Sequence, residues 1–197
     1  MKPLSRRFSG ILFAVFVLLM VGTRFGHFGT AIHLPDASMA VFFLGGLYLG
    51  LDGWRRHAGF AFFVLLAVAL DWASISYAGV SDFCVTAAYA FLPLAYAVLW
   101  YAGSWYAKRI EGRLPFLLGA LAVAVVAASL SFAISNGSFY WLGGRYANPH
   151  VAEYLSRLAQ WGPLFVRTTT FYVATALAIH GLLAWAANAR AGHRADV

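Results

Sequence analysis

The sequence predicts an all-α polytopic membrane protein with six transmembrane helices, and three observations carry this prediction. Of the 197 residues, 62% are hydrophobic and only 11% are charged, whereas a soluble domain has about 25% charged residues. The apolar residues form continuous runs rather than alternating with polar ones, which favours helices over a β-barrel. A single cysteine, Cys84, excludes an internal disulfide framework. At roughly 20 residues per span, we expect one transmembrane domain covering residues 1–197.

Each predicted span is an apolar run bounded by charged, glycine or proline residues. The six approximate spans are 8–23, 37–51, 58–77, 83–106, 115–134 and 163–187. The first follows a basic segment, as the core of a signal peptide does, and we expect it to remain as a span. The fourth contains Pro93, where a kink is expected because proline removes a helix hydrogen bond.

Basic residues gather in alternate connections. Most of the 14 Lys and Arg residues fall in four clusters: Lys2, Arg6 and Arg7; Arg55 and Arg56; Lys108, Arg109 and Arg113; Arg190 and Arg194. The positive-inside rule places these clusters, and with them both termini, in the cytoplasm. Because the clusters are short and lie at the ends of apolar runs, the net charge of +7 does not indicate nucleic-acid binding.

The two predicted outer connections carry most of the polar and aromatic residues that could recognise a ligand. Residues 26–36 contain His33, and residues 136–162 form the longest connection, rich in aromatic side chains and containing Arg157. Arg157 has the chemistry to bind an anionic or amide-bearing ligand, or it lies in water on a loop helix. No catalytic or phosphate-binding motif occurs, so the chain has no signature of an ATPase.

Asp71 is an ionisable residue inside the third apolar run. It follows His57 by 14 positions, which places it roughly 20 Å from the inner end of the span, in the outer half of the membrane. An ionised group there costs about 2.5–3.5 kcal/mol unless it faces protein or water. Asp71 is therefore either a functional group that lines a cavity or a hydrogen-bonded group that fixes helices together.

Cys84 lies at the predicted outer start of the fourth span, after Ser81 and Asp82, either of which has the side chain of a helix cap. A helix amino terminus favours anions, so we expect a lowered thiol pKa and a thiolate able to bind a soft metal or act as a nucleophile. The alternative is a small buried hydrophobic residue. Tyr89, about 140° further round an ideal helix, either borders the same pocket or is an interfacial tyrosine.

These residues together resemble a known family. The run from His33 to Ser38, His-Leu-Pro-Asp-Ala-Ser, leads into a helix rich in Phe, Leu and Gly, and is followed by Asp71-Trp72, Cys84 and Tyr89. This order resembles the BtuM family of bacterial vitamin B12 uptake proteins, and the resemblance covers nearly the whole chain. That family is related to the substrate-binding S-components of energy-coupling factor (ECF) transporters, which have six helices and hold a vitamin at the outer face.

The resemblance implies a function and a set of site residues. The chain would bind cobalamin or a related corrinoid and move it across the cytoplasmic (inner) membrane, with cobalamin as transported ligand and no other cofactor. Cys84 would be an axial ligand of the cobalt, and Asp71, Tyr89, Arg157 and His33 would bind the substrate. No residue is expected to be catalytic. Displacement of cyanide from cyanocobalamin by the thiolate would add a ligand-exchange reaction to transport, which leaves open whether the chain is also an enzyme.

The resemblance does not decide whether the chain needs a protein partner. S-components dock an energising ECF module through an alanine pair spaced by three on the first helix, whereas this chain has Gly10 and Ala14. Transport by the chain alone, as a monomer in the bilayer, therefore stays open. Three other interpretations remain: an S-component for another vitamin, a structural or sensory membrane domain, and a membrane enzyme in which Cys84 is the nucleophile and His33 its base.

Overall fold

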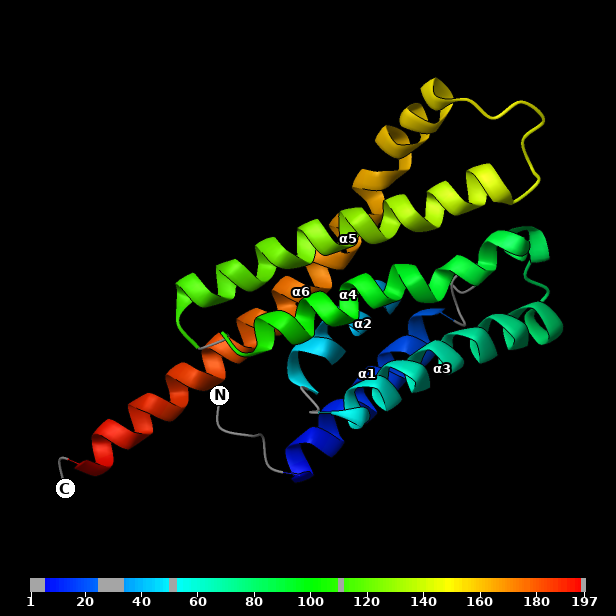
Figure 1. Ribbon diagram of the computed structural model, residues 1–197. Coiled ribbons are helices and arrows are strands. Elements are labelled where there is room, and N and C mark those ends of the chain that lie inside the picture. Colours follow the sequence, from blue (N-terminus) through cyan, green and yellow to red (C-terminus); the bar gives the residue numbers. More distant parts are fainter. Residues whose placement is uncertain (1–5, 25–33, 50–52, 110–111, 196–197) are drawn as a thin grey trace.

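The computed structural model describes residues 6–24, 34–49, 53–109 and 112–195, and every regular element in these ranges is a helix (Figure 1). The elements are α1 (Arg6–Arg24), α2 (Ser38–Tyr48), α3 (Trp54–Ala78), η1 (Asp82–Cys84), η2 (Ala87–Phe91), α4 (Leu92–Ala107), α5 (Leu114–Leu142) and α6 (Val151–Ala195). Successive α-helices run in opposite directions. As a result α1 begins and α6 ends at one end of the molecule, while η1, η2 and the 143–150 connection lie at the other.

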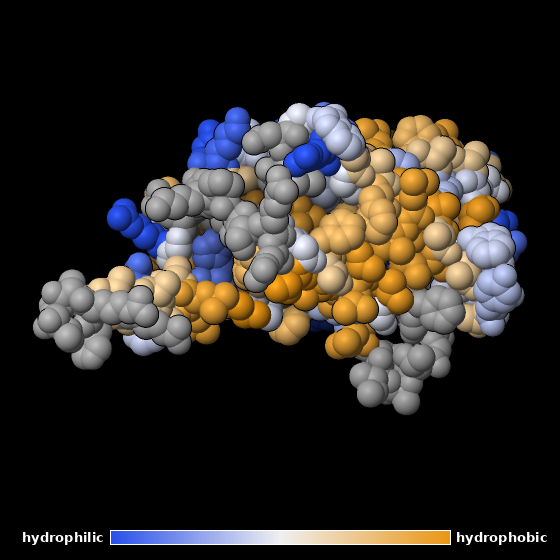
Figure 2. All heavy atoms as spheres, turned by 90° about the horizontal axis from the view of Figure 1, so that it is seen from below, coloured by the Kyte–Doolittle hydropathy of each residue, from blue (hydrophilic) through white to orange (hydrophobic). Residues whose placement is uncertain are grey.

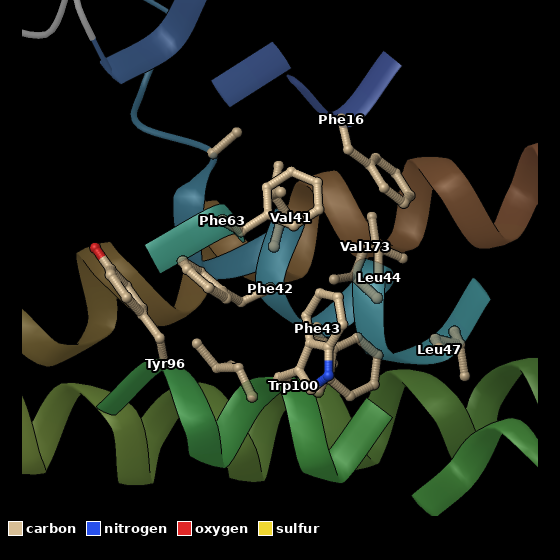
Figure 3. Close-up of a cluster of buried hydrophobic side chains, with 14 of the residues drawn as sticks. Phe16, Val41, Phe42, Phe43, Leu44, Leu47, Phe63, Tyr96, Trp100 and Val173 are labelled. Carbon is tan, nitrogen blue, oxygen red and sulfur yellow. The ribbon is translucent and has the colours of Figure 1, made fainter. Parts of the chain in front are cut away.

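The short helix α2 forms the centre of the bundle. Nine of its 11 residues are buried, against α4 on one side and α1, α3 and α6 on the others. Figure 3 shows Phe42 and Phe43 of α2 among side chains from these neighbours. The ring of Phe42 stacks on Tyr96 of α4, with centroids 4.1 Å apart and planes 13° from parallel. At about 1.5 Å per residue α2 is only about 16 Å long, so its stability comes from this burial rather than from its length.

Glycine allows α2 and α4 to approach at backbone distance. A Cβ atom at Gly46 would collide with the carbonyl oxygen of Trp100, and one at Gly103 would collide with that of Phe43. Each helix therefore contributes a glycine at the point where the other helix presents a backbone carbonyl. Small residues at a crossing are the usual means of close helix packing in membranes.

Among the residues that the structure describes, four helical segments are long and apolar enough to cross a membrane: Trp54–Ala78, Ala87–Ala107, Leu114–Leu142 and Val151–Ala189. Large apolar side chains on their outer faces are exposed, for example Leu65 at 68% and Phe171 at 67%. Figure 2 shows hydrophobic residues covering a broad part of one face, with hydrophilic ones near its margins. This surface fits a lipid environment. The other two predicted spans correspond to shorter apolar helices, Phe8–Arg24 and Ser38–Tyr48.

The predicted boundaries differ from the observed ones at the start of the fourth span. The structure has no continuous helix over residues 83–106; instead η1 and η2 precede α4. Pro93 lies in the first turn of α4, where its missing N–H has no intrahelical partner to lose. Pro93 therefore lies where the 3-10 helix η2 gives way to α4, rather than inside a continuous α-helix.

The predicted long connection over residues 136–162 is mostly helical. Helix α5 continues to Leu142 and α6 begins at Val151, which leaves only residues 143–150 between them. Helix α6 has 45 residues and contains Pro163, near which its axis changes direction in Figure 1. At about 68 Å it is longer than any bilayer is thick, and its carboxyl-terminal part projects beyond the other helices.

Candidate functional site

A cluster of polar side chains is built around Arg24, the last residue of α1. The Arg24 guanidinium donates from Nε to Oδ1 and from Nη2 to Oδ2 of Asp71, each at 2.6 Å. This is the parallel two-bond geometry that guanidinium and carboxylate groups form best. The side chains of Arg24 and Asp71 are only 10% and 25% exposed, so the pair lies largely inside the protein.

The third nitrogen of Arg24 binds the start of α2 and a tyrosine of α4. Its Nη1 lies 2.8 Å from Tyr96 Oη, 3.0 Å from Ser38 Oγ and 3.3 Å from Asp36 Oδ2. Asp36 in turn accepts hydrogen bonds from the backbone N–H and the hydroxyl of Ser38, at 2.8 and 2.6 Å. The carboxylate of Asp36 thus binds an otherwise free N–H at the start of α2 and faces the Arg24 cation at the same time.

Tyr89 of η2 completes the set by donating its hydroxyl to Asp71 Oδ2 at 2.6 Å. We call these six residues the Arg24 cluster: Arg24, Asp36, Ser38, Asp71, Tyr89 and Tyr96. They come from α1, the start of α2, α3, η2 and α4, so the cluster connects five segments at one end of the bundle. One guanidinium faces two carboxylates, and the second carboxylate leaves the cluster with an excess negative charge when all three groups are ionised.

The structure gives Asp71 the partner that an ionisable residue inside a span needs. Three of the roughly four hydrogen bonds that a carboxylate accepts are used by Arg24 and Tyr89. Asp71 therefore fixes helices together, as one of the two sequence interpretations requires. The side chain of Asp71 is nevertheless not fully buried, since 25% of it is exposed.

Cys84 is the last residue of the three-residue helix η1, and its side chain is exposed. Ser81 caps this turn by accepting a hydrogen bond from the Phe83 N–H at 3.2 Å, as its position suggested. However, Cys84 does not lie at the amino terminus of an α-helix, because α4 begins only at Leu92. The site thus lacks the helix dipole on which the predicted thiolate depended.

The expected lowering of the Cys84 pKa is wrong for this reason. Partial burial raises the pKa of the Cys84 thiol, and the negative charge of Asp71 raises it further. The positive charge of Arg145 acts in the opposite direction but does not outweigh them. Burial and the Asp71 charge both favour the neutral thiol over the thiolate.

An aromatic row extends from the Cys84 turn across the end of α5. Its members are Phe83, Phe139 and Tyr146, with centroid separations of 5.8 Å and then 6.4 Å. A guanidinium covers each end of the row: that of Arg145 lies 4.7 Å from the Phe83 ring centre and that of Arg157 lies 4.8 Å from the Tyr146 ring centre. Cationic groups favour such positions because the faces of aromatic rings carry partial negative charge.

The structure brings the predicted site residues together in two groups. Asp71 and Tyr89 share a hydrogen bond in the Arg24 cluster, whereas Arg157 belongs to the aromatic row. The charge of Asp71 acts on Cys84, which connects the two groups. His33 lies outside the described residues. On α1, Gly10 and Ala14 lie on an exposed face, with no described atom within 4 Å of a Cβ built on Gly10.

Sequence reasoning missed Arg24 and Arg145 as site residues. Arg24 ends an apolar run, where a cation is common at the membrane surface. Its partnership with Asp71 was nevertheless detectable in principle, since both lie toward the predicted outer side. Arg145 carried no such signal, because its relation to Phe83 depends on the tertiary packing of a short connection.

Two apolar grooves open on the sides of the helices, away from both groups. One, of about 380 Å³, lies between α5 and α6 and is lined by residues such as Phe132 and Pro163. The other, also about 380 Å³, lies between α4 and α5 beside Trp105. No predicted site residue lines either groove. Within the described part of the chain, no group of three or more His, Cys, Asp or Glu side chains is placed to hold a metal ion.

No model of a known protein family matches the chain, and no curated protein matches it by sequence.

Proposed function

We propose that the chain binds a corrinoid at the end that carries Cys84 and moves it across the cytoplasmic membrane, with cobalamin as the transported ligand. The observation that carries this proposal is the exposed Cys84 thiol beside the aromatic row. A thiolate is a strong donor for a soft or borderline metal. The aromatic row offers apolar surface to a broad flat macrocycle lying against the same end of the molecule.

The proposal also includes how many segments cross the membrane and on which side the termini lie. In it α1 and α2 complete a six-segment, S-component-like bundle with both termini in the cytoplasm. Support comes from the alternation of helix directions and from the basic residues, since Arg55, Arg56, Lys108 and Arg109 all lie at or near the end opposite Cys84. The sequence resemblance to the BtuM family supports the same arrangement and a bacterial inner-membrane location.

The proposed binding step includes a ligand exchange when the substrate is cyanocobalamin. The sulfur of Cys84 forms a bond to cobalt as the cobalt–cyanide bond breaks. Because the thiol is protonated beforehand, its proton leaves with the cyanide as hydrogen cyanide, and no oxidant or reductant is consumed. Asp71 and Tyr89 act in this proposal by holding η2, and thereby the Cys84 turn, against α1 and α3. Arg157 and His33 are proposed to contact the substrate.

The visible spectrum of a corrinoid tests cobalt ligation directly. The purified full chain in detergent should shift the absorption bands of cyanocobalamin and release cyanide, while Cys84→Ala should do neither. Val85→Ala is the matched control, because Val85 is an exposed neighbour in the same turn. An unshifted spectrum with the unaltered chain, or equal shifts with Cys84→Ala, would contradict the proposed ligation.

Uptake is tested separately in cells. A strain that needs vitamin B12 and lacks its own importer should grow on trace cobalamin when it expresses this chain, with or without an ECF module. Growth only in the presence of the module would identify it as the partner. Co-purification of a different vitamin would show that this vitamin, and not a corrinoid, is the substrate.

A further inference from the structure

Arg145 is held in a fixed position beside the Cys84 turn. Its Nη2 donates to the backbone carbonyl oxygen of Phe83, the residue before Cys84, at 3.1 Å. The Cζ atom of the guanidinium also lies over the Phe83 ring, 4.7 Å from its centre. One hydrogen bond and one ring contact therefore hold this cation against Phe83. Phe83 directly precedes Cys84, whose sulfur is proposed to bind cobalt.

Most of the hydrogen-bonding capacity of Arg145 is still free for a ligand. A guanidinium has five N–H donors, and in the described part of the chain one of those of Arg145 has a partner. No carboxylate pairs with Arg145 among the described residues, in contrast to Arg24, which faces Asp36 and Asp71. Arg145 is also exposed, so a solute arriving at the Cys84 turn meets its charge directly.

The chemistry of the proposed substrate supplies a matching group. The side chains around a corrin ring are neutral amides, and the phosphodiester that connects the nucleotide to the ring is the anionic group of cobalamin. Guanidinium binds phosphate oxygens through parallel hydrogen bonds. The guanidinium of Arg24 already faces two carboxylates, so the Arg24 cluster is expected to repel anions, whereas the Arg145 end of the aromatic row presents an unpaired positive charge among the described residues.

We propose that Arg145 binds the phosphodiester of the corrinoid and so selects complete cobalamins over corrinoids that lack this group. The inference rests on the proposed function, and it adds a specificity-determining residue to that site. Phe83 holds the guanidinium in place, and Cys84 and Arg145 then bind two different parts of one substrate.

The test compares three corrinoids on the purified full chain. Cobalamin carries the phosphodiester and the base, cobinamide phosphate carries a phosphate without the base, and cobinamide carries neither. Arg145→Gln should weaken the binding of the first two by about tenfold, the loss expected for one charge-assisted hydrogen-bond pair. The affinity for cobinamide should stay within about twofold, and Arg145→Lys should recover part of the loss because it keeps the charge.

Arg109→Gln is the matched control. Arg109 also stacks on an aromatic ring, that of Trp105 at 4.2 Å, and also donates to a backbone carbonyl oxygen, at 3.3 Å, but at the opposite end of the molecule. Arg109→Gln should leave the affinities for all three corrinoids unchanged. Equal losses for all three corrinoids with Arg145→Gln, or no loss for any, would overturn the phosphate contact. Failure of the unaltered chain to bind any corrinoid would instead remove the proposed function itself, so the two failures are distinguishable.

Discussion

The Arg24 cluster and the Cys84 turn lie at the same end of the bundle but differ in how their polar groups are used. In the Arg24 cluster, both carboxylate oxygens of Asp71 accept hydrogen bonds from Arg24, and one also accepts from Tyr89. In the Cys84 turn, the thiol is exposed, and Arg145 makes one hydrogen bond within the described part of the chain, to the backbone. The first region thus has the features of a structural connection, and the second has the features of a surface that receives a ligand.

This difference separates two roles that a sequence pattern cannot separate. Asp71 and Cys84 are both polar residues near the outer ends of apolar runs, and both are expected to belong to one site. In the folded chain Asp71 stabilises the position of the segments, while Cys84 keeps its bonding capacity. Substitutions in the two regions should therefore affect different measurements.

The largest expected effect is on stability, from Asp71→Asn. The change removes one of the two negative charges beside Arg24, whose side chain is only 10% exposed, and leaves that of Asp36. We expect a loss of about 2 kcal/mol in the free energy of unfolding, less than the 3–5 kcal/mol of a fully buried pair because Asp71 is partly accessible. Thermal or detergent-induced unfolding measures it. Asp82→Asn, at an exposed carboxylate in η1, is the control, and equal stability of the two variants would show that the ion pair contributes nothing.

The next effect is on the pH dependence of cobalt ligation. With aquacobalamin, whose leaving ligand is neutral water, the thiol proton goes to solvent when the thiolate binds cobalt, so the affinity should rise by about tenfold per pH unit as long as the free thiol is protonated. Burial and the charge of Asp71 raise the pKa of Cys84, so the rise should continue through neutral pH. Spectroscopic titration at several pH values measures it, and an affinity that falls with pH would contradict thiolate ligation.

The same titration connects the two regions. In Asp71→Asn the negative charge that raises the Cys84 pKa is absent, so the affinity should stop rising at a lower pH than in the unaltered chain. An unchanged titration curve in this variant would show that the two regions are electrostatically independent.

A smaller effect is expected from Tyr89→Phe. The variant removes one hydrogen bond to Asp71 Oδ2 at 2.6 Å but leaves both bonds from Arg24. We expect a loss of about 1 kcal/mol in unfolding free energy. Tyr77→Phe, at an exposed tyrosine near the end of α3, should have no measurable effect. If Tyr89→Phe is as stable as the unaltered chain, η2 is held by its packing alone.

The smallest effect on stability is expected from Cys84→Ala, the variant with the strongest predicted effect on ligand binding. An exposed side chain in a short turn contributes little to folding, so the unfolding free energy should change by less than about 0.5 kcal/mol. A loss comparable to that of Asp71→Asn would place Cys84 in the structural region and would contradict the distinction between the two.

The helical class and the approximate position of most elements were predictable because apolar runs of this length have few other solutions. The boundaries were less predictable, since hydropathy does not show where a helix starts. Pro93 illustrates this: within an apolar run it suggests a kink, but Thr86 accepts a hydrogen bond from the Ala88 N–H and starts η2, so that Pro93 falls in the first turn of α4.

The structure brings two of the candidate site residues into contact, but their partners and the electrostatics around Cys84 were not predictable. Asp71 and Tyr89 are joined by a hydrogen bond, and their separation along the chain, on different elements, gave no indication of it. The direction of the Cys84 pKa shift was wrong because it depended on a helix start at that residue. Long-range partners such as Arg24 and Arg145 depend on how segments pack, and one sequence carries no direct record of packing.

The glycine contacts between α2 and α4 also restrict how the molecule can move. Gly46 and Gly103 place backbone against backbone, so the two helices cannot slide along each other or rotate without a collision of main-chain atoms. We therefore expect the two helices to move as one unit. In the proposed transport cycle, the other helices would then move around this central pair.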